Sequence, residues 1–380
     1  MTRVYLIRHG EAEGNIYRRA QGQYQSELTA KGLRQVEALA ERFKDEHIDA
    51  LYSSGLKRTQ LTAGAITKYH DLPMQLEPRL REISLGPWED RPFGDLQHFE
   101  KEQMLHFNDD PDRWYVEGAE TFPALKERIL AVILELAAKH DGQTIVCVSH
   151  GMAIRTVLAE FLGIASHEIF RIPHGDNTSV SLLEVDAAGV RVVYCNNTDH
   201  LPEELSTFAR QSWWKRPGGE DLNNIWFRRL DPQKQPGKYL KFYEKTWCAV
   251  HGSPAGFQGA YYLTAAVRHF KACPDAIVTI HHPDGETVGI TELDTERGAE
   301  EGVGWVCLCY VEELYRRSQL GVQLIGHAVS VFRRLGRKRI RLSVFEENTG
   351  AIRFYEEYGF RKISETEGVF GTLNIMEKDI

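Results

Sequence analysis

The chain contains 380 residues, more than one hydrophobic core normally organises, so its length predicts two domains of ordinary size. Hydrophobic residues make up 42% of the chain and charged residues 26%, values typical of globular proteins. The formal net charge of −8 argues against a dedicated nucleic-acid or membrane-surface binder, so we expect neither partner. The longest apolar helical run, 129–138, is interrupted by Glu135 and is too short to cross a bilayer.

The N-terminal sequence and the cysteines both favour a cytoplasmic location. No apolar signal segment precedes Arg8. The six cysteines form no CxxC pair, and Cys307 and Cys309 alternate along one expected strand, where they share a face and cannot easily form a disulfide. We therefore expect reduced thiols in a cytosolic protein. The sequence gives no indication of the oligomeric state.

The first expected strand ends abruptly in a polar motif. Residues 4–7 are apolar β-formers, and Arg8, His9 and Gly10 follow directly. Open α/β sheets place their ligand sites at the carboxyl ends of buried strands. A glycine at this point lets the backbone turn tightly and come close to a ligand.

Two later strands also end beside a group that can carry positive charge. Strand 51–54 leads into a helix whose first turn contains Arg58, and strand 144–149 ends in His150. The intervening pattern predicts helices at 29–46 and 121–139. Because the carboxyl ends of parallel strands meet at one edge of a sheet, we expect these cationic groups to lie together.

Such a cluster predicts a pocket for a phosphate dianion. The guanidinium groups of Arg8 and Arg58 match phosphate oxygens in pairs, and helix N-termini add N–H donors. An imidazole in the pocket can attack phosphorus and form a covalent intermediate. A metal site on His9 and His150 is the competing interpretation. Neither histidine has a further ligand at the spacing of an HExxH motif, so we expect no metal.

A leaving alkoxide needs a proton, and Glu82, near the aromatic Trp88, is the candidate donor. An apolar, anion-rich site would raise the pKa of its carboxyl group and favour an acid role. Glu89 and Asp90 are the rival acids nearby.

Four motifs, RHGEAEGN, SSGLKRTQLTA, LREISLGPWED and VSHG, occur in order between residues 8 and 151. Together they resemble the histidine phosphatase superfamily (phosphoglycerate mutase-like) over roughly 1–200. The resemblance implies a three-layer α/β/α domain that acts on a small phosphorylated substrate and needs no cofactor.

The resemblance also implies a role for each matching residue. His9 is the expected nucleophile, Glu82 is the proton donor, and the remaining positions hold the phosphoryl group or line the pocket. The holders of the phosphoryl group are Arg8, Arg58 and His150, and the pocket wall is formed by Asn15 and Gln21. His174 is a further histidine that could approach the pocket.

Two reactions fit this pocket, hydrolysis of a phosphomonoester and phosphoryl transfer of the phosphoglycerate mutase kind. They differ only in whether the phosphoryl group goes to water or returns to substrate. The compact stretch between Glu82 and His150 favours hydrolysis.

The chain changes character near residue 200. Residues 178–195 predict two hydrophobic edge strands, which complete a first domain at 1–200. Residues 201–235 are irregular and predict a linker, although three tryptophans suggest that it packs against something. A second domain is expected at 236–380.

The second domain has its own sequence pattern. It predicts two helices followed by a hairpin, a central strand that is apolar on both faces, and a last strand before a loop and helix. The helices are at 236–250 and 257–272, and the strands at 275–281, 286–294, 303–311 and 339–345.

A cationic loop and a helix follow strand 303–311, and a helix with the sequence FYEEYGF follows strand 339–345. The spacing RxxQxG in the loop, with this later helix, resembles the acetyl-CoA-binding core of the GNAT acyltransferases over roughly 236–380. The resemblance implies a mixed α+β domain that transfers an acetyl group to an amine acceptor. The expected contacts to acetyl-CoA are Arg316, Arg317, Gln319, Gly321, Val322 and Asn348.

One departure concerns Gln319, which stands where the family usually has the first glycine of the pyrophosphate loop. A side chain there could crowd the phosphates, so an acyl-CoA-binding module without catalysis is the alternative. Tyr355 matches the position that in many relatives protonates the leaving thiolate, or else it packs on an amphipathic helix. Asn348 is either a turn-former or a cofactor contact, and Glu292 is the candidate general base.

The basic run 333–339 lacks interleaved aromatic residues and belongs to an acidic protein. It therefore predicts a solvated helix end rather than a nucleic-acid site.

Overall fold

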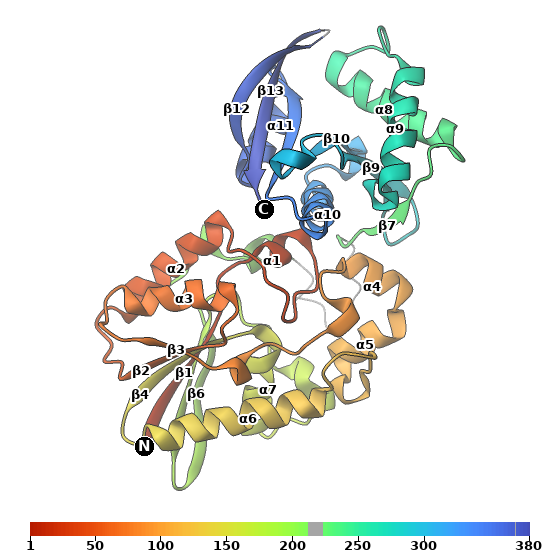
Figure 1. The fold of residues 1–380 in the computed structure, drawn as a ribbon. Helices are drawn as coiled ribbons and strands as arrows, with labels where there is room; N and C mark the ends of the chain where they lie inside the picture. The colour runs from red at the N-terminus through yellow and green to blue at the C-terminus, as the bar shows by residue number, and fades with distance from the viewer. Residues whose placement is uncertain (212–222, 369) are drawn as a thin grey trace. The chain divides into compact units, whose positions relative to one another are not determined.

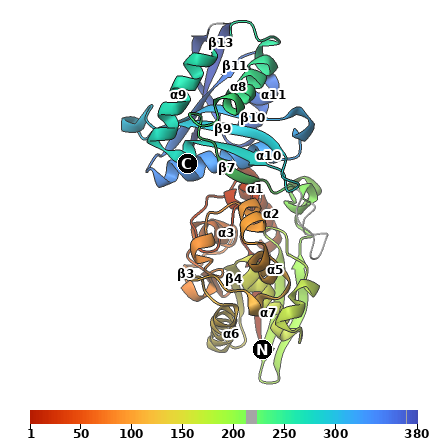
Figure 2. The same cartoon turned by 90° about the vertical axis from the view of Figure 1, so that its right-hand side faces the viewer.

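The structure is a computed structural model that describes residues 1–211, 223–368 and 370–380. These residues form two compact units, which are shown from two sides in Figures 1 and 2. The first unit contains Met1–Arg91 and Phe99–Asp221, and the second contains Pro92–His98 and Leu222–Ile380. No helix in the described part of the chain is long and apolar enough to cross a membrane.

The first unit is built on a six-stranded mixed sheet. Its strands, in spatial order, are β3 (Met74–Leu76), β2 (Ala50–Ser53), β4 (Thr144–Ser149), β1 (Thr2–Arg8), β5 (Val180–Asp186) and β6 (Gly189–Asn197). The first four are parallel, and β5 and β6 are antiparallel additions at one edge. Strand β4 is buried throughout, as expected for a strand covered on both faces.

Helices cover both faces of this sheet, with α2 and α3 on one side and α6 and α7 on the other (Figure 1). The helices of the unit are α1 (Glu13–Tyr17), α2 (Ala30–Phe43), α3 (Lys57–Thr67), α5 (Lys101–Asp109), α6 (Phe122–Lys139) and α7 (Gly151–Phe161). Thr29 and Thr121 cap α2 and α6 by accepting hydrogen bonds from backbone N–H groups of the first turn. Phe43 of α2 packs edge-on against Tyr5 of β1, with ring centroids 5.1 Å apart.

The second unit is built on a seven-stranded sheet. Its strands, in spatial order, are β12 (Arg361–Gly368), β13 (Gly371–Asp379), β11 (Arg339–Phe345), β10 (Val303–Val311), β9 (Thr287–Asp294), β8 (Ile277–His281) and β7 (Trp226–Arg229). Among these strands only β10 and β11 pair in parallel, from Val303–Arg339 to Val306–Leu342. Residues 307–311 of β10 are therefore not paired with β11.

The remaining helices pack on this second sheet. They are α8 (Pro236–His251), α9 (Gly259–Ala272), α10 (Leu320–Arg334) and α11 (Thr349–Glu357). A Cβ at Gly304 would lie 2.2 Å from the ring of Phe332, so glycine lets α10 approach β10 closely. The predicted helices and strands of both units are confirmed to within a few residues at their ends. Sequence analysis missed the helices at 93–109 and the hairpin formed by β12 and β13.

The prediction that 201–235 is a linker is wrong for its described residues. Leu205 and Phe208 are buried in the first unit, and β7 is an edge strand of the second sheet. Apolar side chains explain the difference, because a solvated linker would expose them. Of the three tryptophans, Trp226 is buried and the other two, at 213 and 214, lie outside the described residues.

A short segment from the first half of the sequence belongs to the second unit. Helix α4 (Phe93–Phe99) places its Asp95 carboxylate 2.8 Å from the backbone N–H of Phe227 in β7. The ring of His98 stacks on Trp226 at 4.0 Å. A Cβ at Gly94 would lie 1.9 Å from the carbonyl oxygen of Ile225, so this helix packs on the chain just before β7. The segment therefore covers an edge strand that would otherwise be open to pairing.

Candidate active sites

Two parallel strands deliver the first site's histidines to one edge of the sheet. Arg8 at the end of β1 pairs with Ser149 at the end of β4, so His9 and His150 follow at matching positions. Their ring centroids are 5.2 Å apart. Arg58 enters from the first turn of α3, and its Nη2 lies 3.2 Å from Nδ1 of His150. The predicted cluster of two arginines and two histidines is therefore present.

The ring of His9 is held in one tautomer. Its Nδ1 lies 2.8 Å from the carbonyl oxygen of Gly10, which can only accept, so Nδ1 carries the proton and Nε2 has a free lone pair. His9 is 3% exposed. Burial, together with the charges of Arg58 and Arg8, lowers the pKa of His9 well below 6.5. The ring is therefore neutral at pH 7, as a nucleophile must be.

The two arginines are partly satisfied by backbone carbonyl groups. Arg58 donates to the carbonyl oxygens of Gly22 at 2.6 Å and Tyr24 at 2.8 Å, and Arg8 donates to that of Gly175. In the described structure the Nε atoms of both arginines are buried and have no hydrogen-bond partner. Buried N–H groups without a partner are costly, so these arginines are suited to receiving an anion. Burial lowers the pKa of Arg58 to about 10, which leaves it charged at pH 7.

His150 is fully buried, and its ring lies between the guanidinium group of Arg58 and the hydroxyl group of Ser54. Because the Arg58 guanidinium can only donate, Nδ1 of His150 accepts, and Nε2 donates to Ser54 Oγ at 2.8 Å. Burial and the charge of Arg58 lower the pKa of His150 well below 6.5. The sequence analysis did not predict the contact between His150 and Ser54, although Ser54 belongs to the SSGLKRTQLTA motif.

Glu82 lies at the N-terminus of α7. Its Oε2 accepts from the N–H of Met152 at 2.9 Å, and its Oε1 accepts from those of Ala153 and Ile83 at 3.0 Å. A Cβ at Gly151 would lie 3.5 Å from Arg8 Nε and 3.9 Å from Glu82 Oε2, so this carboxylate borders the arginine pocket. These N–H groups hold the carboxyl oxygens of Glu82 at the edge of the arginine pocket.

The rival acids are engaged elsewhere. Asp90 forms an ion pair with Arg19 at 2.7 Å, and Glu89 accepts from the backbone N–H groups of Gln23 and Leu85 at 3.0 and 3.2 Å. The charge of Glu89 acts on Arg58 less strongly than that of Glu82, and of the two only Glu82 also acts on Arg8. Glu82 is therefore the carboxylate best placed beside the arginines.

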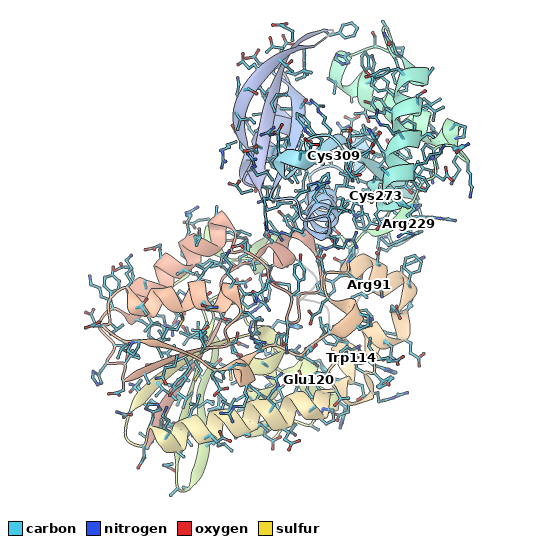
Figure 3. The ribbon with its side chains drawn as sticks, in the orientation of Figure 1. Arg91, Trp114, Glu120, Arg229, Cys273 and Cys309 are labelled. Carbon is cyan, nitrogen blue, oxygen red and sulfur yellow. The ribbon has the colours of Figure 1, made fainter. Side chains whose placement is uncertain are left out.

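Arg128 of α6 fixes the loop that carries Glu82. Its guanidinium donates to the carbonyl oxygens of Arg79 at 2.6 Å and Arg81 at 3.0 Å and forms an ion pair with Glu120 at 2.7 Å. Glu120, which is labelled in Figure 3, accepts from the N–H of Ser84 at 3.1 Å. Sequence reasoning missed this support because Arg128 lies more than forty residues beyond the loop that it holds.

The expected pocket-wall residues make local contacts. Asn15 Oδ1 accepts from the N–H of Ala12 at 2.9 Å, and Gln21 Oε1 accepts from Ser26 at 2.7 Å. Both side chains are partly exposed. His174 lies 3.2 Å from a guanidinium nitrogen of Arg155, and burial lowers its pKa well below 6.5.

The loop before α10 keeps a backbone shape that glycine favours. Arg317 and Gln319 have φ values of 63° and 59°, in the left-handed region. Gln319 therefore has a backbone conformation that glycine adopts readily. Arg316 and Arg317 are exposed, and Arg316 Nε donates to the carbonyl oxygen of Val311 at 2.9 Å.

Gly321 lets helix α10 pack closely against α11. A Cβ at this position would lie 3.1 Å from the ring of Phe354 in α11. A larger residue at Gly321 would therefore meet Phe354. Val322 is buried, so its side chain packs in the core, and only its backbone N–H is suited to an anion.

Two residues at α11 have clear local roles. Asn348 caps this helix by accepting from the N–H of Ala351 at 3.1 Å, which is the turn-forming alternative. Tyr355 hydrogen-bonds to Cys309 of β10, which is labelled in Figure 3. Burial and Cys309 raise the pKa of Tyr355 well above 10, so its hydroxyl group keeps its proton at pH 7.

Glu292 of β9 is buried and takes part in a polar network. Its Oε2 accepts from the hydroxyl group of Tyr239 at 2.7 Å, and its Oε1 lies 2.7 Å from Nδ1 of His269. Both oxygens are therefore occupied by protein groups.

Comparisons with known proteins identify a family for each half of the chain. Residues 4–198 match the family described as histidine phosphatase superfamily (branch 1), and residues 242–360 match the acetyltransferase (GNAT) family. These matches confirm the two predicted resemblances and the predicted fold classes.

Individual relatives match the first unit. The chain is 30% identical over 203 residues to phosphoserine phosphatase 1 of Hydrogenobacter thermophilus. The aligned region covers 53% of this chain and 96% of that protein. It is 38% identical over 209 residues to the probable phosphoglycerate mutase GpmB of Yersinia pestis. That alignment covers 53% of this chain and 95% of GpmB. The solved structure of Bacillus stearothermophilus YhfR matches with a TM-score of 0.51 and 30% identity, covering 53% of this chain and 99% of that one.

Proposed function

The chain belongs to the histidine phosphatase superfamily, and from this premise we propose that its first unit hydrolyses a small phosphomonoester through a phosphohistidine at His9. The single observation that supports this most strongly is the hydrogen bond from Nδ1 of His9 to Gly10, which leaves Nε2 ready to attack. The buried Nε atoms of Arg8 and Arg58 supply donors for the phosphoryl oxygens.

The reaction has two steps. In the first, Nε2 of His9 attacks phosphorus, the ester P–O bond breaks, and the leaving oxygen takes a proton from the carboxyl group of Glu82. In the second, a water oxygen attacks phosphorus, the P–N bond breaks, and the carboxylate of Glu82 takes the proton of the water. His150 stays neutral until the dianion binds, and its hydrogen bond to Ser54 keeps the ring in place.

Phosphoryl transfer is the second candidate, since the relatives include both a phosphoserine phosphatase and a probable phosphoglycerate mutase. Incubation with phosphoserine and with each phosphoglycerate isomer, followed by phosphorus NMR, separates the two. Hydrolysis predicts free phosphate from at least one ester and no interconversion of isomers. Isomerisation that outpaces phosphate release would favour the mutase.

We further propose that the second unit transfers an acyl group from acetyl-CoA to an amine. The chemistry fits, because exposed Arg316 and Arg317 and the first-turn N–H groups of α10 are suited to a pyrophosphate. The left-handed backbone at Gln319 supports the same fit. Acetyl-CoA supplies an activated thioester when bound. Tyr355 holds a proton on its hydroxyl oxygen beside Cys309, and Glu292 is the candidate base.

Calorimetry of the full chain with acetyl-CoA tests this second activity, with Arg316→Ala/Arg317→Ala as the variant that should weaken binding. A screen of amine acceptors with free-thiol detection then separates transfer from binding alone. Binding without thiol release for any acceptor would favour the non-catalytic module, and no binding at millimolar acetyl-CoA would contradict both.

A further inference from the structure

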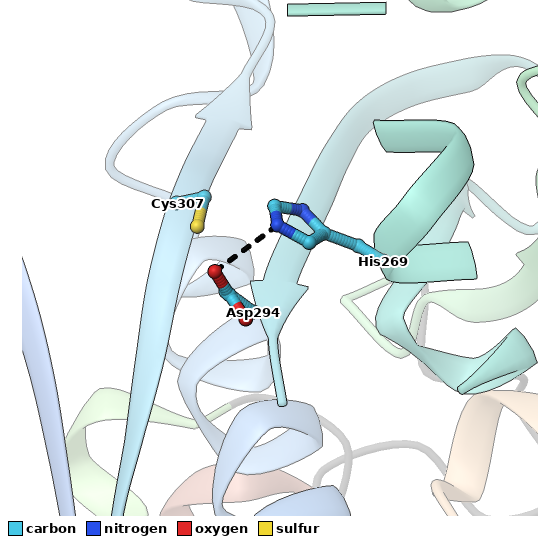
Figure 4. Close-up of side chains that lie close together, drawn as sticks. All are labelled: His269, Asp294 and Cys307. Atoms are coloured by element: carbon cyan, nitrogen blue, oxygen red, sulfur yellow. Dashed lines mark ion pairs between the residues drawn. The ribbon is translucent and has the colours of Figure 1, made fainter. Parts of the chain in front are cut away.

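Three side chains of different chemistry meet in the second unit. They are His269 of α9, Asp294 at the end of β9 and Cys307 of β10, which Figure 4 shows side by side. Their nitrogen, oxygen and sulfur atoms all lie within 4.8 Å of one another. His269 and Asp294 are buried, and Nε2 of His269 is 3.1 Å from Oδ2 of Asp294.

A β-bulge brings Cys307 to this cluster. Along the β9–β10 pair, Val306 is opposite Leu293 and Leu308 is opposite Glu292, so Cys307 is the extra residue. A bulge changes the direction in which a side chain points, and bulges are frequent beside functional sites. The parallel pairing of β10 with β11 also stops at Val306, which leaves Cys307 exposed.

The buried network around Glu292 orients His269. The histidine's Nδ1 lies 2.7 Å from Oε1 of Glu292, and the hydroxyl group of Tyr239 donates to Oε2 at 2.7 Å. Nδ1 donates to the carboxylate of Glu292, and Nε2 faces Oδ2 of Asp294 at 3.1 Å, where it donates to this second carboxylate until a metal ion displaces its proton. A carboxylate that holds the second nitrogen of a ligating histidine is the usual outer shell of a metal site.

We propose that His269, Asp294 and Cys307 bind a zinc ion, with a water molecule as fourth ligand. Imidazole nitrogen, thiolate sulfur and carboxylate oxygen are the donors that zinc prefers, whereas magnesium and calcium prefer oxygen alone. Zinc ligands at about 2.0–2.3 Å from the ion lie roughly 3.3–3.8 Å from one another in a tetrahedron. The His269–Asp294 distance of 3.1 Å is close to this range, and the sulfur of Cys307 lies within 4.8 Å of both other ligand atoms. Binding displaces the thiol proton of Cys307 and the Nε2 proton of His269.

The positive charge of Arg268 opposes the binding of a metal ion at this cluster. Nη2 of Arg268 lies 3.2 Å from Nε2 of His269 and 3.6 Å from Oδ2 of Asp294. Its side chain is 63% exposed, so it can move into solvent when the metal binds. The proposal therefore predicts that removing this guanidinium strengthens metal binding.

The test uses the full chain stripped of metal by a chelator and then titrated with zinc and with cobalt(II). We expect one metal per chain at this site and, with cobalt, the near-ultraviolet charge-transfer band of a thiolate ligand. Cys307→Ser should remove the band and weaken zinc binding by at least about 10-fold, and Glu292→Gln should weaken it by about 10–100-fold. Arg268→Ala should tighten it.

Cys309→Ser is the matched control, because this cysteine lies two residues along the same strand and contacts Tyr355 instead. It should keep both the band and the affinity. Circular dichroism checks that each variant is folded, and the exposed position of Cys307 makes its serine variant the least disruptive. The absence of a cobalt–thiolate band in the parent chain, or an unchanged band in Cys307→Ser, would overturn the proposal.

Discussion

The two candidate active sites hold their charged groups in different ways. In the first unit His9, Arg58 and His150 are buried, and the side chains of His9, Arg58 and Glu82 each bond to at least one backbone group. In the second unit the loop arginines are exposed, and the shape of the loop comes from two left-handed residues. The comparison teaches that one site is fixed before its ligand arrives, whereas the other relies on backbone shape and lets its arginines adjust.

The largest expected effect is loss of the nucleophile in the pre-organised site. His9→Ala should lower phosphomonoester hydrolysis by more than about 10³-fold, since it removes the covalent route. Phosphate release from a good substrate measures this. His98→Ala, which changes a histidine of the second unit, is the matched control and should leave hydrolysis unchanged. Substantial turnover by His9→Ala would show that the fixed ring is not the nucleophile.

A smaller effect is expected for the proton donor. Glu82→Gln should slow alkyl phosphates by roughly 10²–10⁴-fold and aryl phosphates with good leaving groups much less. The reason is that a good leaving group needs little protonation. Glu89→Gln serves as the control, with its side chain bonded to the N–H groups of Gln23 and Leu85. Equal losses for both substrate classes would indicate that Glu82 only positions α7.

The units should also differ in their response to acid. The pKa values of His9 and His150 are lowered well below the unfolded value of about 6.5, mainly by burial. At pH below 6.5 the unfolded chain therefore binds more protons than the folded one, so the stability of the first unit falls as pH falls. Each histidine contributes on the order of 1 kcal/mol per pH unit.

In the second unit, burial lowers the pKa of His281 to about 4 and lowers that of His251, whereas Glu292 outweighs the effect of burial and raises the pKa of His269, so the net loss is smaller. Scanning calorimetry from pH 7.5 to roughly 5 resolves the two transitions, given that the units unfold separately. The first should lose more stability than the second, and added phosphate should reduce that loss. A first transition that is insensitive to pH would contradict the buried neutral state of these histidines.

The smallest effect concerns helix packing beside the second site. Gly321→Ala places a methyl group 3.1 Å from the ring of Phe354 and should lower the stability of the second unit by about 1 kcal/mol. Gly350→Ala in α11 is the matched control, with its Cβ 3.9 Å from Asn348, and should be neutral or stabilising. Urea unfolding measures both. Equal stability of the two variants would mean that Phe354 moves freely.

More of the first site than of the second could be predicted from the sequence, and the reason is physical. A buried strand is a continuous apolar run, so the residues directly after it, such as His9 and His150, can be placed at a sheet edge without coordinates. The N–H groups that bind Glu82 could not be foreseen, because they depend on how α7 meets a loop far away in the chain. The same holds for Arg128, which supports that loop from α6.

Tertiary packing also decides features that the sequence pattern leaves open. The glycine pattern at Gly321 is the same whether its missing side chain makes room for a phosphate or for Phe354. Residues 223–235 looked irregular because β7 is only four residues long and its pairing partner, β8, lies fifty residues further on. The hydrogen bond from Ala351 shows the capping role of Asn348, whereas a contact to the cofactor stays a prediction.

The most direct test of the account is to capture the intermediate on His9. The full chain would be mixed with a phosphomonoester and quenched in alkali within milliseconds, since phosphohistidine is stable there, and then digested and analysed by mass spectrometry. The account predicts one phosphoryl group on the peptide that contains His9, attached at Nε2, and none in His9→Ala. A phosphoryl group on another residue, or steady hydrolysis with no phosphorylated peptide in a burst experiment, would contradict it.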